Sequence, residues 1–348
     1  MEKDNRLQHL KTILLLGVVV NHAWSASQYV STPQIPPWHF VCWFSNVLII
    51  SGLPVFFFLS GFFAGKRSEE VLSWSGYGTM LKKKVRSLAV PYICWNLLFI
   101  VFYLSVGSFI PRIGQRVASF RLDTAWGAFN LLLGVTRKPI DAPLWFIRDL
   151  FLIFCFMPLL VWLMKRAWWL LVAGALLLLV FPFGVYRNWY SVVFFTLGLV
   201  AAKRSFDLRQ FEKWRWLAIS VWIVFSVCLY WYVTSRNLYR PDPRASIWFY
   251  IAATFAWLGI ARWTDFGKDS FFARHVTPAS FFIYCSHFLF CSMLLHTLAG
   301  KVPDSPFKMA ILYFVFIGAG GGLILAIFYL GRRFCPKMLA ILSGGRVS

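Results

Sequence analysis

Long apolar stretches alternate with short polar connections along most of this 348-residue chain. A helix that crosses the hydrocarbon core of a membrane needs roughly 20 apolar residues. The stretches that approach this length are residues 10–29, 41–64, 88–108, 143–164, 167–184, 188–203, 214–234, 244–263, 279–299 and 308–331. A transmembrane β-barrel would instead show strands of about ten residues in which apolar and polar positions alternate. The pattern therefore predicts an all-α, polytopic membrane helix bundle of about ten transmembrane helices, folded as a single domain over residues 1–348.

Two features interrupt the long apolar stretches. Prolines such as Pro54, Pro91 and Pro158 lie inside predicted spans, where neighbouring helices can bond the backbone carbonyls that a proline leaves free. We expect these prolines to mark bends. The apolar stretch 123–135 is too short to cross the membrane, and it is predicted to form an interfacial or re-entrant helix.

The composition agrees with a membrane protein, because 59% of the residues are apolar, 20% are aromatic and only 14% are charged. The formal net charge of +22 raises the question of nucleic-acid binding. No hydrophilic stretch is long enough to fold such a module, so we expect no nucleic-acid partner. The seven cysteines form no CxxC pair and mostly fall in apolar stretches. A disulfide framework and a metal site are therefore not expected.

Lysine and arginine are about twice as frequent in one set of alternating connections as in the other. Cytoplasmic connections carry such an excess, so we expect both termini to lie in the cytoplasm. Much of this charge needs no function beyond setting the topology and attracting anionic lipid in the bilayer.

Two histidines are predicted to reach the middle of the membrane. At a helical rise of 1.5 Å per residue, His22 lies roughly 16 Å from Lys11, which shares its helix face near the inner headgroups. By the same rise, His287 lies about 12 Å above the inner boundary of its span. A polar side chain at this depth is costly and marks a functional site by default. The structural alternative is a neutral histidine that is hydrogen-bonded between helices.

The fourth predicted span carries two charged residues. Arg148 and Asp149 lie some 8–9 Å below its outer boundary. Adjacent helical residues point about 100° apart, so these two are expected to contact different helices. An internal ion pair is the structural alternative. Trp145 lies one turn before Asp149 and could stack on a sugar, although tryptophan is also common at membrane interfaces.

A mid-membrane imidazole suits acyl transfer. A histidine can accept the proton of an alcohol as the oxygen attacks an acyl donor. A carboxylate can hold the ring in the right tautomer, and a cation or an amide can stabilise the developing oxyanion. The phosphates of the donor would need cytoplasmic cations at the inner ends of the first three spans. The candidates there include Arg6, Lys11, Lys66, Lys82 and Arg86.

Five segments of the chain, taken in order, are "RLQHLKTILLLGVVVNH" ending at His22, "FFFLSGFF" from Phe56, "KKKVRSLAVPY" ending at Tyr92, "PLWFIRDL" from Pro143, and "SFFIYCSH" ending at His287. Together they resemble the membrane acyltransferase 3 family of bacterial O-acyltransferases. The first is similar to the family motif in which a basic residue precedes a catalytic histidine by eleven positions. Lys11 stands where many members have arginine, which keeps the charge but loses the bidentate fork. In the second segment, Ser60 and Gly61 are expected to let helices approach closely.

The resemblance covers nearly the whole chain and implies a donor and an acceptor. The donor is acyl-CoA, most commonly acetyl-CoA, on the cytoplasmic side of the bacterial inner membrane. The acceptor is a hydroxyl of a sugar or cell-surface glycan outside. The resemblance makes His22 the leading catalytic residue, as general base or transient acyl carrier. His287 and Asp149 are expected to orient or polarise the site, and Trp145 and Arg148 to contact the acceptor.

Two other classes of protein fit part of the pattern. A proton-coupled transporter or flippase for a glycan or organic anion could use buried histidines and Asp149 to relay protons. Inverted repeats with paired broken helices would favour that class, and none stands out in the sequence. A haem protein would need His22 and His287 face to face on facing helices.

Overall fold

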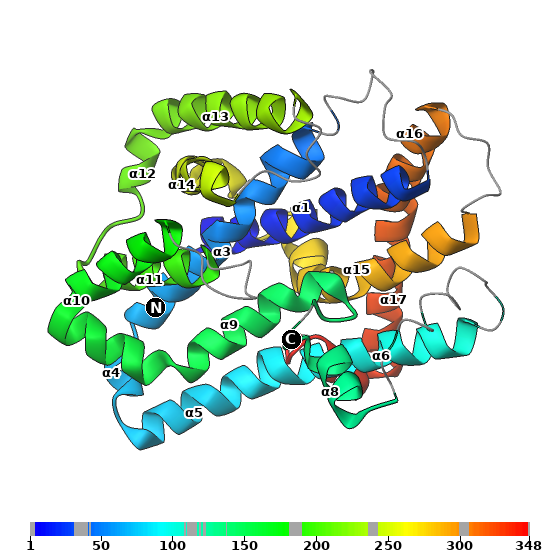
Figure 1. Ribbon diagram of the computed structural model, residues 1–348, viewed down its shortest axis with the longest axis horizontal. Helices are drawn as coiled ribbons and strands as arrows, with labels where there is room; N and C mark the ends of the chain where they lie inside the picture. The colour runs from blue at the N-terminus through cyan, green and yellow to red at the C-terminus, as the bar shows by residue number, and fades with distance from the viewer. Residues whose placement is uncertain are drawn as a thin grey trace. The chain divides into compact units, whose positions relative to one another are not determined.

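The computed structural model describes residues 4–30, 41, 43–107, 109, 117, 120, 123–136, 138–180, 190–235, 243–298 and 306–346. Every regular element among these residues is a helix, and none is a strand (Figure 1). The all-α prediction is therefore confirmed. Parts of the predicted spans 167–184, 188–203 and 279–299 lie outside the described residues.

Several helices of the described chain are long and apolar enough to cross a membrane, judged by length and composition. They are Trp43–Gly65, Trp74–Val106, Met157–Leu178, Arg215–Tyr232 and Ile311–Phe334. Shorter apolar helices cover Tyr190–Lys203 and Ser246–Gly259. These helices indicate a membrane protein, as predicted. The number of about ten spans and the cytoplasmic side of the termini stay predictions.

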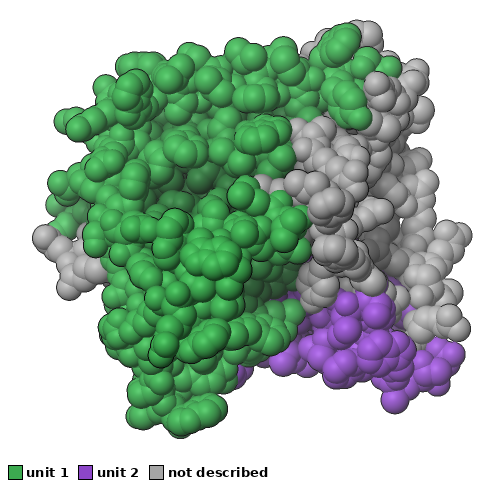
Figure 2. All heavy atoms as spheres, turned by 60° about the vertical axis from the view of Figure 1, so that its left-hand side comes forward, with its two compact units in different colours: residues 1–17, 40–83, 149–274 green, residues 18–39, 84–148, 275–348 purple. Residues whose placement is uncertain are grey.

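The chain folds into two compact units, which Figure 2 draws in different colours. Unit 1 comprises residues 1–17, 40–83 and 149–274. Its elements are the first part of α1 (Asn5–Val30), η2 (Trp43–Leu48), η3 (Ile49–Gly52), α3 (Leu53–Gly65), α4 (Ser68–Val71), most of α5 (Trp74–Lys84), most of α9 (Trp145–Cys155), α10 (Met157–Val180), α11 (Tyr190–Lys203), α12 (Gln210–Lys213), α13 (Arg215–Ser235), α14 (Pro243–Gly259), η6 (Ala261–Thr264) and part of η7 (Phe272–Val276).

Unit 2 comprises residues 18–39, 84–148 and 275–348. Besides the second part of α1 and the first turn of α9, its elements are η4 (Val85–Ala89), α6 (Val90–Val106), α8 (Ala125–Leu133), η5 (Ala142–Leu144), α15 (Thr277–Leu298), α16 (Pro306–Val315), η8 (Phe316–Gly320), α17 (Gly321–Phe334) and α18 (Pro336–Leu342). Here η marks a π-helical or 3₁₀ turn. Both units are built from segments that are far apart in the sequence.

The fourth predicted span, 143–164, is not one helix. α9 ends at Cys155 and α10 begins at Met157. Pro158 lacks the amide N–H that would continue the hydrogen-bond ladder, so the break falls beside it. Inside α10, Ala167 has non-helical backbone angles (φ −150°, ψ 58°) at the boundary expected between two spans. Pro158 thus marks a bend, as predicted. The boundary expected between the spans 143–164 and 167–184 is a kink at Ala167 within α10.

In unit 1, α3 and α11 cross with their backbones in contact. A Cβ atom on Gly61 would collide with the carbonyl oxygen of Phe195, and a Cβ on Gly198 would collide with that of Phe58. The obstructing atoms belong to the backbone, so no rotamer change can relieve the collision. Small residues allow such close crossings in membrane helices. The segment "FFFLSGFF" is therefore a helix-crossing surface, which agrees with the role expected for Gly61.

In unit 1, the buried His9 makes contacts that hold two segments of the chain together. Nδ1 of His9 lies 3.2 Å from the carbonyl oxygen of Thr264, and the Thr264 hydroxyl donates a bond of 3.0 Å to the carbonyl oxygen of Arg6. These contacts fasten the start of α1 to the turn after α14. His9 therefore illustrates a histidine whose role is to hold two segments together.

In unit 2, α8 packs along α6. It begins after Thr124, the N-cap residue, and ends at Gly134, whose φ of 65° is left-handed. The hydroxyl of Tyr92 on α6 donates a bond of 2.8 Å to the carbonyl oxygen of Leu133. Leu131 joins a buried cluster formed mainly by side chains of α6. The helix expected within 123–135 therefore exists, and it is fastened to a membrane-spanning helix.

Pro91 interrupts the hydrogen-bond ladder at the start of α6. Without an amide N–H, it cannot bond the carbonyl of Ser87, four residues earlier. That carbonyl accepts a bond of 3.1 Å from the guanidinium of Arg346, which also lies 3.8 Å from the centre of the Phe281 ring. A distant segment therefore completes the ladder, as expected for prolines in membrane helices.

Candidate active site

The imidazole rings of His22 and His287 are in contact within unit 2. Their centroids lie 5.3 Å apart, and their planes are inclined by 44°. His22 is half-buried on α1, whereas His287 is fully buried on α15. Phe288 packs against the His22 ring, with centroids 5.2 Å apart. Two histidines singled out near opposite ends of the sequence thus form one site.

Hydrogen bonding sets the tautomer of His287. Nδ1 lies 2.6 Å from the carbonyl oxygen of Tyr284, so this nitrogen carries the proton and donates it. The neutral ring then has its lone pair on Nε2, which has no hydrogen-bond partner in the described part of the chain. A buried imidazole nitrogen in this state can accept a proton. His287, expected to orient or polarise the site, therefore also has the geometry of a base.

Tyr284 connects two of the segments that the sequence singled out. Its hydroxyl donates a bond of 2.5 Å to the carbonyl oxygen of Pro143. The centroid of its ring lies 6.1 Å from that of His287, which is one helical turn further along α15. The spacing Tyr-x-x-His therefore places a fastening residue beside the imidazole.

Asp141 is a buried carboxyl group of unit 2 that the sequence did not single out. It is fully buried just before η5, and its backbone N–H donates a bond of 3.1 Å to Oδ1 of Asn96. Neither carboxyl oxygen has a hydrogen-bond partner among the residues described. Burial raises the pKa of Asp141 well above its usual range, which favours the neutral acid. The available signal was its position two residues before Pro143, where a family-like segment begins.

The other predicted site residues of the fourth span lie on α9. Arg148 donates a hydrogen bond to the carbonyl oxygen of Gly134, so its guanidinium closes the end of α8. Trp145 is half-buried beside Phe146, with ring centroids 6.3 Å apart. Asp149 is buried and belongs to unit 1. Its role toward the histidines stays a prediction, as does acceptor binding by Trp145 and Arg148.

Two of the predicted donor-binding cations gather at the C-terminal end of α3. Nζ of Lys11 lies 4.4 Å from the centre of the Phe63 ring, and Nζ of Lys66 lies 4.7 Å from that of Phe62. The two rings pack edge to face, 5.8 Å apart. Cation–π contacts of this kind hold an ammonium group in place without neutralising its charge. Lys66 is exposed and remains able to meet an anion, whereas Lys11 is half-buried.

The remaining predicted cations differ from this pair. Arg6 binds two carboxylates, Asp4 at 2.7 Å and Glu212 at 2.5 Å, so its charge is already balanced. Lys82 is exposed on α5 of unit 1, and Arg86 is exposed on η4 of unit 2. Arg6 is thus ion-paired, whereas Lys82 and Arg86 are exposed charges, and donor binding by the three stays a prediction.

Among the described residues, no three or more His, Cys, Asp or Glu side chains are grouped so that they could hold a metal ion. Haem ligation would require the nitrogens of His22 and His287 to point at one iron from opposite sides. The two rings instead pack directly against each other, with centroids 5.3 Å apart. This contact does not match the haem alternative.

Comparison with known proteins gives the family. Residues 4–331 match the acyltransferase domain that defines the acyltransferase 3 family. The chain belongs to the acyltransferase 3 family. This acyltransferase 3 protein is similar to the succinoglycan biosynthesis protein ExoH of Rhizobium meliloti (strain 1021). The two are 23% identical over 362 residues, which cover 98% of this chain and 92% of ExoH. No solved structure matches.

Membership in the acyltransferase 3 family makes this protein a membrane acyltransferase that transfers groups other than amino-acyl groups. Such a reaction needs an acyl donor and a base for the acceptor. In this acyltransferase 3 chain, the contact of His22 with His287 supplies two imidazoles to one site. Phe288 covers one of the rings with apolar surface, which strengthens electrostatic interactions around them.

Proposed function

We propose that this acyltransferase moves an acyl group, most simply acetyl, from cytoplasmic acyl-CoA to a hydroxyl of a sugar or cell-surface glycan. The protein would act as a multi-pass enzyme of the bacterial inner membrane. The contact of His22 with His287 inside apolar helices is the observation that carries the proposal. A polysaccharide acceptor is supported by the similarity to a protein named for succinoglycan biosynthesis.

The chemistry proposed for the pair is a proton transfer coupled to acyl transfer. The acceptor oxygen attacks the thioester carbonyl while an imidazole nitrogen takes the hydroxyl proton. A carbon–oxygen bond forms, the carbon–sulfur bond breaks, and the imidazolium returns the proton to the departing thiolate. In the direct route, His22 is the general base and His287 polarises or relays the proton through Nε2. In the two-step route, a ring nitrogen of His22 carries the acyl group transiently.

The donor is proposed to approach from the basic inner side. Lys11 and Lys66 hold charge at one end of α3, and the exposed Lys82 and Arg86 add charge at the surface. These residues would attract the phosphates of acyl-CoA. Arg6 would contribute by holding the start of α1 in place, because its guanidinium already binds two carboxylates.

The polar groups around the acceptor complete the proposed site. Trp145 and Arg148 would contact the sugar, and Asp149 would orient an imidazole. Asp141 is added to this set, because a fully buried neutral acid without a hydrogen-bond partner can donate a bond to a polar atom of a substrate. Buried polar groups in proteins are otherwise almost always paired.

The direct test is transfer of labelled acetyl from acetyl-CoA to glycan in membranes that contain the wild type or His22→Ala. Mass spectrometry of the surface polysaccharide then looks for the added mass of one acyl group. We expect the wild type to add this mass and His22→Ala to lose it at equal protein abundance. Unchanged acylation in His22→Ala, together with loss of glycan movement, would instead indicate a transporter or flippase.

A further inference from the structure

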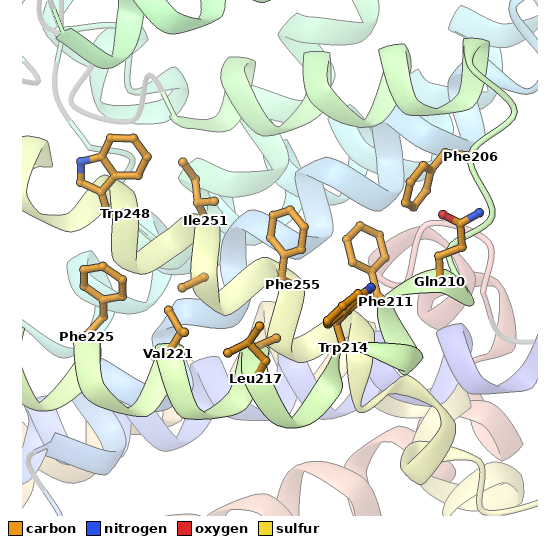
Figure 3. Close-up of a pocket in the computed structure, with 12 residues that line it drawn as sticks. Phe206, Gln210, Phe211, Trp214, Leu217, Val221, Phe225, Trp248, Ile251 and Phe255 are labelled. Carbon is orange, nitrogen blue, oxygen red and sulfur yellow. The ribbon is translucent and has the colours of Figure 1, made fainter.

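Unit 1 contains an apolar groove between α13 and α14, with α12 at one end (Figure 3). Its volume is about 490 Å³. Leu217 and Val221 line it from α13, and Ile251 and Phe255 line it from α14. Gln210, at the α12 end, supplies the amide among these largely apolar side chains. The groove therefore suits a hydrocarbon chain with one polar end.

The length of the groove matches one leaflet of a membrane. Figure 3 shows Gln210 and Trp214 at one end and Phe225 and Trp248 at the other. Trp214 and Phe225 are eleven residues apart, which corresponds to roughly 16 Å of helix. Half of a hydrocarbon core of about 30 Å is about 15 Å. A groove of this length can hold an acyl chain from the headgroup level to the middle of the bilayer.

The charges lie at the Gln210 end. Arg209 and Lys213 flank α12, and both are exposed. Of the nearby acids, Glu212 is bound to Arg6 at 2.5 Å, and Asp207 accepts the backbone N–H of Arg209 at 3.0 Å. Counting Arg6 and Arg215 as well, this end carries four cations against the three carboxylates of Asp4, Asp207 and Glu212, which favours an anion there.

We propose that this groove binds one acyl chain of an anionic phospholipid from the surrounding leaflet, with the phosphate beside Arg209 and Lys213. An amphipathic peptide helix is a poorer fit, because its diameter of about 10 Å is greater than the width of one hydrocarbon chain. The basic end at Arg209 and Lys213 selects the headgroup, and the apolar side chains along α13 and α14 contact the acyl chain. The site lies outside the histidine pair and does not depend on the proposed acceptor or donor.

The test is native mass spectrometry of the full chain, purified in a neutral detergent and titrated with phosphatidylglycerol or with phosphatidylcholine of the same acyl chains. We expect one phosphatidylglycerol to bind at lower concentration than phosphatidylcholine. Each basic residue near an anionic lipid contributes about 1 kcal/mol, or about fivefold in affinity. The variant Arg209→Gln/Lys213→Gln should therefore lose most of the preference, whereas Lys268→Gln, an exposed cation elsewhere in unit 1, should keep it.

A second variant tests the groove itself. Ala218 lines the groove, and Ala218→Phe should fill it and abolish the preferred binding event. Val224→Phe adds the same bulk to an exposed position of α13 that does not line the groove, and it should bind as the wild type does. Equal binding of the two lipids by the wild type would overturn the proposal. So would an equal effect of the two phenylalanines, or retained preference in the double charge variant.

Discussion

Unit 1 and unit 2 leave different kinds of buried polar atoms without partners. In the described part of unit 1, such atoms include Nε1 of Trp222 and Nε of Arg215, neither of which exchanges a proton near neutral pH. In the described part of unit 2, they include Nε2 of His287 and both carboxyl oxygens of Asp141. An unpaired buried polar group costs about 1–3 kcal/mol. Unit 2 thus retains an imidazole and a carboxyl group whose unpaired atoms weaken its fold, while unit 1 also buries one carboxyl group, that of Asp149.

The two histidines of α1 show the same contrast. His9 in unit 1 is bonded to a backbone carbonyl, whereas His22 in unit 2 contacts a second imidazole. Functional sites commonly retain groups that are unfavourable for stability. The contrast makes the histidine pair of unit 2 the first place to test for the chemistry, and His9 of unit 1 the matched structural control. The predictions below test this contrast.

The largest effect on the rate of acyl transfer is expected from substituting a histidine of the pair. His287→Gln removes the Nε2 lone pair and should lower the rate of acyl transfer by about 10² to 10⁴-fold, the usual contribution of a general base. The matched substitution His9→Gln removes a structural histidine and should leave the rate within about threefold per folded molecule. Initial rates with labelled acyl-CoA, normalised to folded protein, measure both. Equal losses in the two variants would contradict the contrast between the two histidines.

The next effect concerns stability in unit 1. Gly61→Ala places a methyl group against the backbone of Phe195, so we expect a loss of at least about 3 kcal/mol and little folded protein. Gly174→Ala in α10 meets no atom within 4 Å, and it should stabilise the helix by about 0.5–1 kcal/mol. Thermal unfolding in detergent measures both. A Gly61→Ala protein as stable as the wild type would show that the crossing is not backbone-limited.

In unit 2, one substitution is expected to raise the free energy of unfolding, by less than Gly61→Ala lowers it in unit 1. Asp141→Leu removes an unpaired buried acid and should raise the free energy of unfolding by about 1–2 kcal/mol while lowering acyl transfer. Asn96→Leu removes a buried amide that bonds both Tyr92 and Asp141, so it should destabilise the protein by about 1–3 kcal/mol. Denaturation curves compare the pair. Destabilisation by both variants would make Asp141 a structural residue.

The pH dependence gives a second readout for Asp141. When folding raises the pKa of an acid, the contribution of that acid to the free energy of unfolding is greatest below its unfolded pKa of about 3.9. This contribution falls as the pH rises toward the folded-state pKa. The folded-state pKa of Asp141 is raised by burial. The difference in unfolding free energy between the wild type and Asp141→Asn should therefore become less favourable to the wild type as the pH rises. A difference that is flat with pH would contradict the raised pKa.

The smallest effect is expected at the start of unit 1. Burial alone would raise the pKa of Asp4, but the hydrogen bond and the charge of Arg6 outweigh it and lower the pKa. Asp4 therefore contributes stability above its unfolded pKa of about 3.9, and the contribution is lost as the pH falls through the lowered value. Asp4→Asn should lower stability by less than about 1 kcal/mol, and added salt should shrink the effect. Melting temperatures at two salt concentrations test this.

The sequence predicted the helical elements because apolar length and polar interruptions are local properties. Pro158 marks the break between α9 and α10 as expected, and the stretch 123–135 holds α8. The π-helical turn η4 was beyond such reasoning. It precedes Pro91, and the carbonyl that this proline leaves free is bonded by Arg346, a contact that only the tertiary fold creates.

The candidate site was predictable where a residue was unusual in its own segment. His22 and His287 are polar groups in apolar helices, and this alone singled them out. Asp141 was missed because it falls in a predicted connection, just before the span 143–164, while its burial arises from packing among α6, η5 and α15. Sequence reasoning assigned Arg6 to the donor without its ion pair to Glu212, because that carboxylate, unlike Asp4 two residues away, becomes a neighbour only after folding.

The bond between Arg346 and Ser87 has a consequence for the order of synthesis. The two residues are 259 positions apart, and ribosomes add roughly 5–20 residues per second. The carbonyl of Ser87 therefore lacks this donor for roughly tens of seconds, while the later helices are still being made.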